Sequence, residues 1–164
     1  MEQNLLEQYI KEHRGTVFRL AYSYVKNREN ADDITQDVFM RLFTTTQTFA
    51  DNAHVKAWLI RVTVNLAKDM LKSGWYRSRE ELPDNIPVET REELRLLESV
   101  KRLKPEYAAV IYLFYYEGYS AEEIARMSGE KPSTIRTRLT RARAQLRELM
   151  KGELDDGFSR TVPQ

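Results

Sequence analysis

Arginine is concentrated in one short stretch of this 164-residue sequence. Residues 131–147 read KPSTIRTRLTRARAQLR, and the apolar residues among them recur at helical spacing. The pattern predicts a helix that begins at Pro132 or Ser133, with one buried stripe and one basic face. Because an arginine can donate two hydrogen bonds to a guanine edge or bind a phosphate, DNA binding is the first chemistry to consider.

The residues before this stretch have the spacing of a helix-turn-helix motif. Ser120 and Glu123 form a capping box, which predicts a short helix from residue 121. Ala125, Gly129 and Ile135 then supply the small residue, the turn residue and the apolar anchor that two crossing helices need. This signature favours DNA binding over a merely solvated arginine-rich face.

The N-terminal part of the second helix is expected to lie in the major groove. Threonine as well as arginine can contact base edges there. The candidate DNA-binding residues of this helix are Ser133, Thr134, Arg136, Thr137, Arg138, Thr140, Arg141, Arg143 and Arg147. Of these, Arg143 and Arg147 are expected to contact phosphates rather than bases.

A second stripe lies on a helix predicted over residues 53–72. Its apolar face is expected to comprise Val55, Leu59, Val62, Leu66 and Met70. Another face carries Trp58, Arg61, Asn65, Lys68 and Lys72. Cations can follow a single-stranded backbone, an aromatic ring can stack on a base, and an amide can bond the edge of an unpaired base. A core tryptophan beside ordinary surface lysines explains the pattern equally well.

A third candidate surface lies on a helix predicted to begin after Asn30, as N-cap, and to end near residue 44. Its first turn would contain Asp32 and Asp33, whose carboxylates the helix dipole favours. A metal-dependent nuclease is disfavoured, because no glycine-rich loop or histidine stands nearby. The polar face comprises Asp33, Gln36, Asp37, Met40 and Arg41, and its methionine suggests a protein partner.

These elements indicate an all-α fold with two small helical domains joined by a flexible linker, the second domain being a helix-turn-helix. Residues 1–72 form the first domain, with a helix over residues 3–26 before the two just described. The proline-containing residues 73–88 are the linker. The second domain covers residues 89–152, with further helices over 89–103 and 105–117, and residues 153–164 are expected to be a disordered tail.

Composition restricts the possible chemistry. The 26 Lys and Arg nearly balance 25 Asp and Glu, so only the distribution of charge points to a polyanion. The absence of cysteine excludes disulfides and thiolate chemistry, and two histidines make a histidine-rich metal site improbable. No run approaches the roughly 18 apolar residues of a membrane span, and no signal peptide is recognisable. We therefore expect a cytoplasmic protein without membrane insertion, metal, cofactor or catalytic activity.

The segments NADDITQDVFMRLF, TFADNAHVKAWLIRVTVNLAKDML and GYSAEEIARMSGEKPSTIRTRLTRARAQL resemble the extracytoplasmic-function sigma factors of bacterial RNA polymerase, in the sigma-70 family. The resemblance implies a promoter reader in which the first domain binds polymerase and melts the minus-10 element, while the second reads the duplex minus-35 element. The implied partners are core RNA polymerase, through the clamp helices of its β′ subunit and its β flap, promoter DNA in double- and single-stranded form, and an anti-sigma factor.

The resemblance also assigns roles to residues. The polar face of the second helix would face polymerase, and the loop over residues 49–55 would hold a flipped minus-10 base. Phe49, Asp51 and Asn52 lie in that loop, and Asn65 would contact the same base region. Arg136, Thr137, Thr140 and Arg141 fall where members of the family touch minus-35 bases and phosphates. Two departures are Lys104 between Leu103 and Pro105, where Leu-Pro is usual, and Ser133 in place of a common glycine.

Two other functions remain open at this stage. A stand-alone helix-turn-helix regulator would use residues 1–88 to sense a ligand or dimerise, and it would bind palindromic sites without polymerase. A polymerase-binding adaptor or inhibitor would not read promoters, so its activity would survive replacement of Arg136 and Arg141 by alanine.

Overall fold

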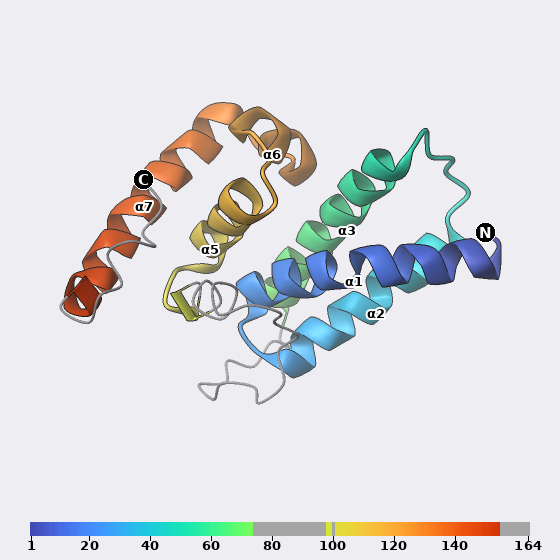
Figure 1. Cartoon of the computed structure of the whole chain (residues 1–164), viewed down its shortest axis with the longest axis horizontal. Helices are drawn as coiled ribbons and strands as arrows, with labels where there is room; N and C mark the ends of the chain where they lie inside the picture. Colours follow the sequence, from blue (N-terminus) through green and yellow to red (C-terminus); the bar gives the residue numbers. More distant parts are fainter. Residues whose placement is uncertain (74–97, 100, 155–164) are drawn as a thin grey trace. The chain divides into compact units, whose positions relative to one another are not determined.

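A computed structural model of the chain describes residues 1–73, 98–99 and 101–154 (Figure 1). Every regular element in these ranges is helical, which confirms the predicted all-α class. The chain divides into two compact units, residues 1–87 (the N-terminal unit) and 88–164 (the C-terminal unit). Among the described helices, none combines the length and the apolar character needed to cross a membrane.

The N-terminal unit contains three helices that pack against one another. They are α1 (Gln3–Val25), α2 (Arg28–Thr44) and α3 (Asn52–Lys72), and each contacts both others (Figure 1). The core draws on all three helices and includes Leu20, Tyr22, Leu42, Leu59 and Ile60. Burial of such apolar side chains is the main source of stability in a small helical unit.

The start of α2 corrects a prediction. Its N-cap is Asn27 rather than Asn30, and the Asn27 side chain accepts a hydrogen bond from the Asn30 N–H at 2.8 Å. Lys26 ends α1 in the left-handed conformation at φ 59°, so the chain passes directly from one helix to the next. Glu29 therefore occupies the first turn. The dipole argument used for Asp32 and Asp33 does not hold, because both lie further along the helix.

The buried face of α3 also differs from the prediction. Val55 and Leu59 are buried, whereas Val62, Leu66 and Met70 are only half-buried. The other buried positions are Ile60, Thr63, Val64 and Ala67. Since α3 packs against both α1 and α2, its buried arc is broader than one residue per turn and is rotated from the predicted stripe.

The C-terminal unit contains α5 (Pro105–Ile111), the π-helical turn η1 (Tyr112–Tyr116), α6 (Ala121–Ser128) and α7 (Pro132–Leu154). The helix predicted over 105–117 is thus interrupted, and the Glu117 N–H bonds the Tyr112 carbonyl at 3.1 Å. Both α5 and α6 pack against α7. The predicted linker, most of the helix predicted over 89–103 and most of the tail lie outside the described residues.

Tyr22 carries a buried polar atom that should cost stability. Its side chain is 0% exposed, and its hydroxyl has no hydrogen-bond partner among the described residues. We expect Tyr22→Phe to raise the free energy of unfolding by about 1 kcal/mol, because the unpaired hydroxyl is removed and the ring is kept. Urea unfolding followed by circular dichroism would measure this. A loss of stability instead would mean that the hydroxyl is satisfied, for example by a buried water.

The same residue predicts sensitivity to alkali. Burial raises the pKa of Tyr22 from 10.0 to about 12. Between these values the unfolded chain loses the phenolic proton and the folded chain keeps it, so folded stability falls as pH rises through this window. In the Tyr22→Phe variant this contribution is absent. Its stability should therefore decline less than that of the wild type between pH 10 and 12, which urea unfolding at a series of pH values measures.

Candidate nucleic-acid interfaces

The turn between α6 and α7 has the predicted helix-turn-helix geometry. The Ser120 hydroxyl accepts the Glu123 N–H at 3.1 Å, and a Glu123 carboxylate oxygen accepts the Ser120 N–H at 3.0 Å, which confirms the capping box. These hydrogen bonds lower the pKa of Glu123. Gly129 ends α6 at φ 68°, and Ala125 and Ile135 are buried where the helices cross. The motif is therefore built as its spacing predicted.

Helix α7 has one buried and one exposed face. Ile135, Leu139, Ala142 and Leu146 are buried, as their helical spacing predicts, whereas Leu149 at the end of the same stripe is half-buried. The exposed side chains include Ser133, Arg136, Thr137, Thr140, Arg141 and Arg147. Positions 136, 137, 140 and 141 lie on neighbouring turns of one face, so their side chains can reach a common groove.

Two arginines of α7 are paired with carboxylates within the motif. Arg136 contacts Glu122 of α6 at 2.9 Å, with both side chains more than half exposed, and Arg138 contacts Glu130 in the turn at 3.4 Å. An exposed ion pair is weak and is screened by salt, so DNA can replace Glu122 as the partner of Arg136. Arg138 is less accessible, at 22% side-chain exposure, and its pair holds α7 to the turn.

Arg143 differs from the other candidates because it packs within the unit. Its Nε donates a short hydrogen bond to the Tyr115 hydroxyl, and its guanidinium lies 5.4 Å from the Phe114 ring centroid and 5.6 Å from that of Tyr115. These contacts fix α7 to η1. From sequence, Arg143 was expected to contact a phosphate, because nothing in the spacing of α7 indicates an aromatic partner 28 residues earlier.

The basic stripe of α3 is accessible. Arg61, Asn65 and Lys72 are exposed, while Trp58 and Lys68 are half-buried. Trp58 also packs edge-on against Phe49, with 5.6 Å between the ring centroids. From sequence, Trp58 could either pack in the fold or lie on an accessible stripe. In the structure it does both.

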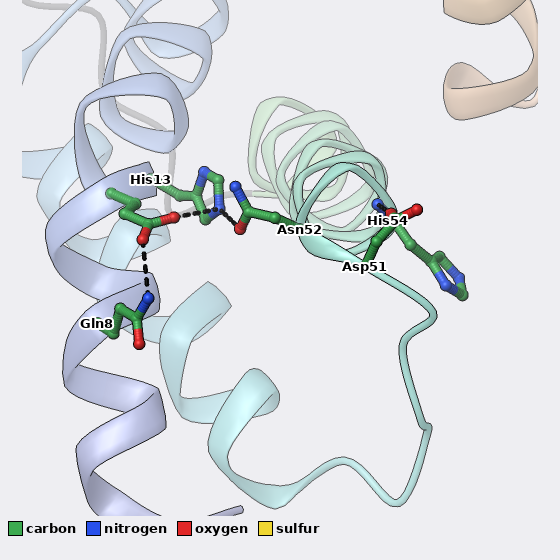
Figure 2. A network of polar contacts seen from close by, with 6 residues as sticks. Gln8, His13, Asp51, Asn52 and His54 are labelled. Carbon is green, nitrogen blue, oxygen red and sulfur yellow. Dashed lines mark hydrogen bonds and ion pairs between the residues drawn. The ribbon is translucent and has the colours of Figure 1, made fainter.

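The loop before α3 ends at Asp51, because residues 52–55 of the predicted loop form the first turn of α3, and it is held by several side chains. Asp51 caps the helix by accepting the His54 N–H at 2.8 Å, and Phe49 packs edge-on against His54 as well as Trp58. The Asn52 side-chain oxygen lies 2.9 Å from His13 Nε2 (Figure 2). Phe49, Asp51 and Asn52, predicted to hold a base, are thus already engaged in contacts within the unit. Neither histidine was predicted from sequence to have a role in this loop.

The predicted polar face of α2 is exposed along its length. Asp33, Gln36, Asp37, Met40 and Arg41 are all accessible, and Arg41 pairs with Asp37 at 3.2 Å. Met40 is 63% exposed, and Phe43, which the sequence analysis omitted, is 43% exposed one turn further on. Two neighbouring exposed apolar side chains favour a surface that binds protein. Phe43 could have been found from its i, i+3 spacing to Met40.

Comparison with known proteins identifies the family. The model of sigma-70 region 2 matches residues 9–77, and that of sigma-70, region 4 matches residues 93–146. The RNA polymerase sigma factor SigV of Bacillus subtilis is 30% identical over 92% of this chain and 94% of its own length. The ECF RNA polymerase sigma factor SigM of Mycobacterium tuberculosis H37Rv is 31% identical over 93% of this chain and 80% of its own length. The chain belongs to the extracytoplasmic-function sigma factors of the sigma-70 family.

As a sigma factor, the protein initiates transcription by RNA polymerase at specific promoters and is not an enzyme. The ECF sigma factor SigE of Mycolicibacterium smegmatis is 33% identical over 88% of this chain, which spans only 61% of that relative. Two solved structures are similar in fold. CnrH in complex with the cytosolic domain of CnrY has a TM-score of 0.65, 26% identity and coverage of 92% of this chain and 90% of that one. RpoE in complex with the anti-sigma factor NepR from Bartonella quintana has a TM-score of 0.67 and 22% identity. The match covers 88% of this chain and 96% of that one.

Two arginines of the sigma factor's α7 should respond differently to alanine substitution. Arg147→Ala removes an exposed cation, so we expect the slope of log affinity against log salt for promoter duplex to fall by about one, with little change in stability. Arg143→Ala removes the contacts to η1, so we expect it to cost about 1–2 kcal/mol of unfolding free energy and leave the slope unchanged. Salt titrations of the holoenzyme and thermal unfolding measure the two effects. The assignment is wrong if the two variants exchange phenotypes.

Glu122 should limit the affinity of the sigma factor for DNA. Glu122→Gln removes the carboxylate that holds Arg136 and that would repel phosphate. We expect promoter-duplex affinity to rise about two- to fivefold, the range of exposed ion-pair energies. Glu106→Gln on the exposed start of α5 makes the same charge change at a carboxylate that pairs with no arginine among the described residues, and it is the control for net charge. Equal gains in the two variants would assign the effect to net charge alone.

Proposed function

We propose that the two units of this sigma factor read two different forms of promoter DNA. The C-terminal unit reads the minus-35 element as duplex, and the N-terminal unit opens the minus-10 element and captures its single strand. The observation that carries the proposal is that each unit exposes one basic helix face with chemistry for one of these forms. Threonines and arginines on α7 suit base edges in a groove, whereas tryptophan, asparagine and cations on α3 suit unpaired bases.

The proposed minus-35 contacts form two groups. Arg136, Thr137, Thr140 and Arg141 contact bases and the adjacent phosphates, because they share the exposed face of α7. Ser133, Thr134 and Arg147 flank them and contact the DNA backbone. Arg138 and Arg143, part of the sequence-based set, are paired within the unit and serve mainly to orient α7.

The proposed minus-10 contacts lie along α3 and its preceding loop. Trp58, Arg61, Asn65 and Lys68 form the surface that meets the melted strand, with Asn65 bonding the edge of a base. The loop over residues 49–55 supplies the pocket wall. The contacts of Phe49, Asp51 and Asn52 within the unit support a role in shaping this loop.

The proposed polymerase surface is the exposed face of α2. Asp33, Gln36, Asp37, Met40 and Arg41, extended by Phe43, would bind the clamp helices of the β′ subunit, and the C-terminal unit would meet the β flap. The exposure of Met40 and Phe43 supports this role, because apolar side chains on a helix face are stabilised when a partner covers them. An anti-sigma factor that covers some of these surfaces is a further proposed partner, in line with the two similar proteins solved as complexes.

The proposed organisation follows the predicted domains. Residues 1–72 are the polymerase-binding and minus-10 domain, 73–88 a linker, 89–152 the minus-35 domain and 153–164 a tail, and the protein acts in the cytoplasm. A tether between two weak readers raises the effective concentration of the second once the first is bound. The net charge of +1 suits a protein that binds promoters only when polymerase presents both domains.

Reconstitution with core polymerase tests the proposal. The sigma factor is mixed with core enzyme lacking any other sigma factor, and salt-stable initiation is scored on genomic fragments. We expect Arg136→Ala to weaken promoter binding about tenfold or more. Asn65→Ala should preserve the closed complex but reduce strand opening, measured by permanganate reactivity of unpaired thymines. Asn4→Ala, on the exposed start of α1, is the matched control.

Three outcomes would contradict the proposal. Failure to initiate on any of many fragments would remove the promoter-reading role. Binding of palindromic sites without polymerase would favour a stand-alone regulator. Full activity of the Arg136→Ala, Arg141→Ala double variant would favour an adaptor that does not read DNA.

A further inference from the structure

We propose that the chain's two histidines are positioning residues that fix the shape of the loop over residues 49–55 before DNA binds. His13 contacts this segment from α1, whereas His54 belongs to it as part of the first turn of α3, and we call the pair the histidine clamp. The proposal rests on the proposed minus-10 role of the N-terminal unit. It gives the histidines a function in base capture without placing either against the DNA.

His13 ties the start of α3 to the middle of α1. Its side chain is buried, with 4% of the residue exposed, and its Nε2 lies 2.9 Å from the side-chain oxygen of Asn52, 39 positions later (Figure 2). With Asn52 assigned in this orientation its oxygen accepts, so the His13 Nε2 must donate. Glu12 lies 3.8 Å from the same nitrogen. A directional hydrogen bond from a buried imidazole holds residue 52 at one place on α1.

His54 holds the other side of the loop through two different atoms. Its backbone N–H donates to Asp51 at 2.8 Å, and its ring Nδ1 accepts the Ala50 N–H at 3.0 Å. Because Nδ1 accepts, the proton of the neutral ring lies on Nε2. The same ring meets Phe49 edge-on, with 5.3 Å between centroids. In Figure 2 the His54 ring points away from the His13–Asn52 pair, so the loop is held from two directions.

The clamp has an energetic consequence for base capture. Seven residues, 45–51, separate the end of α2 from the start of α3. Ordering a free loop costs conformational entropy for each residue that becomes fixed, and this cost reduces the affinity for DNA when the loop orders only on binding. In a loop that the clamp already fixes, this entropy is lost when the chain folds, so it does not reduce the affinity for DNA. Releasing one residue should therefore weaken capture of the minus-10 strand about tenfold without affecting other surfaces.

Amide side chains provide matched variants for each histidine. The glutamine side-chain nitrogen can take the place of imidazole Nε2, and the asparagine oxygen can take the place of Nδ1. His13→Gln should therefore keep the bond to Asn52, whereas His13→Asn is too short. His54→Asn should keep the bond from the Ala50 N–H, whereas His54→Gln places its oxygen too far out. Glutamine is therefore expected to keep the contact at position 13, and asparagine is expected to keep it at position 54.

The functional test uses holoenzymes and a promoter recovered by the wild-type protein. Its non-template minus-10 strand and a scrambled strand are the two probes, and the ratio of their affinities is measured. We expect His13→Asn and His54→Gln to lower this ratio about tenfold and His13→Gln and His54→Asn to keep it within about twofold. Affinity for core polymerase and for minus-35 duplex should be unchanged in all four variants. Equal ratios for the two members of each pair would overturn the proposal.

A separate measurement tests the clamp without DNA. In a Trp75→Phe background, Trp58 is the remaining tryptophan, and it packs against Phe49 of the loop. Acrylamide quenching of its fluorescence should increase in His13→Asn and His54→Gln but not in the rescuing variants. If no promoter is recovered or the wild type does not discriminate between the strands, the proposed function fails and quenching alone decides on the clamp. Unchanged quenching in all four variants would overturn it.

Discussion

Burial of one face of a helix determines which side chains on its other face can meet DNA. In α7 the stripe from Ile135 to Leu146 packs against α5 and α6, and this packing turns Arg136 and Arg141 outward. In α3 the arc around Ile60 and Val64 packs against α1 and α2 and exposes Arg61 and Asn65. Neither basic face could hold its orientation without the apolar face behind it, because most of the stability of a helix in a protein comes from packing of its apolar face.

The features that sequence predicted correctly are local ones. The capping box, the turn at Gly129 and the stripe of α7 each depend on residues within one or two helical turns, so their spacing carries the information. The cap of α2 was misplaced by three residues because Asn27 and Asn30 are both good caps, and only the left-handed Lys26 just before Asn27 ends α1 there. The observed buried arc of α3 is rotated from the predicted one because two helices, α1 and α2, pack against α3 rather than one.

Contacts between residues that are far apart in the chain could not be predicted from the sequence alone. Arg143 meets Tyr115 from 28 positions away, and His13 meets Asn52 from 39. In both cases the residue type is compatible with a surface role, and no periodicity distinguishes an arginine on an aromatic ring from one on a phosphate. The structure reassigns these residues by giving them partners. It thereby separates side chains with partners inside a unit from side chains exposed on its surface.

This separation also accounts for how a nearly neutral chain can present arginines to DNA. Carboxylates of the same motif lie beside two of the α7 arginines, Glu122 at Arg136 and Glu130 at Arg138. In the more exposed pair, a phosphate or a guanine can replace Glu122 as the partner of Arg136 at small cost, because water already screens the interaction. The less exposed pair loses more on opening and remains part of the fold. Exposure therefore sorts arginines of the same helix into those available for recognition and those that hold the recognition helix in place.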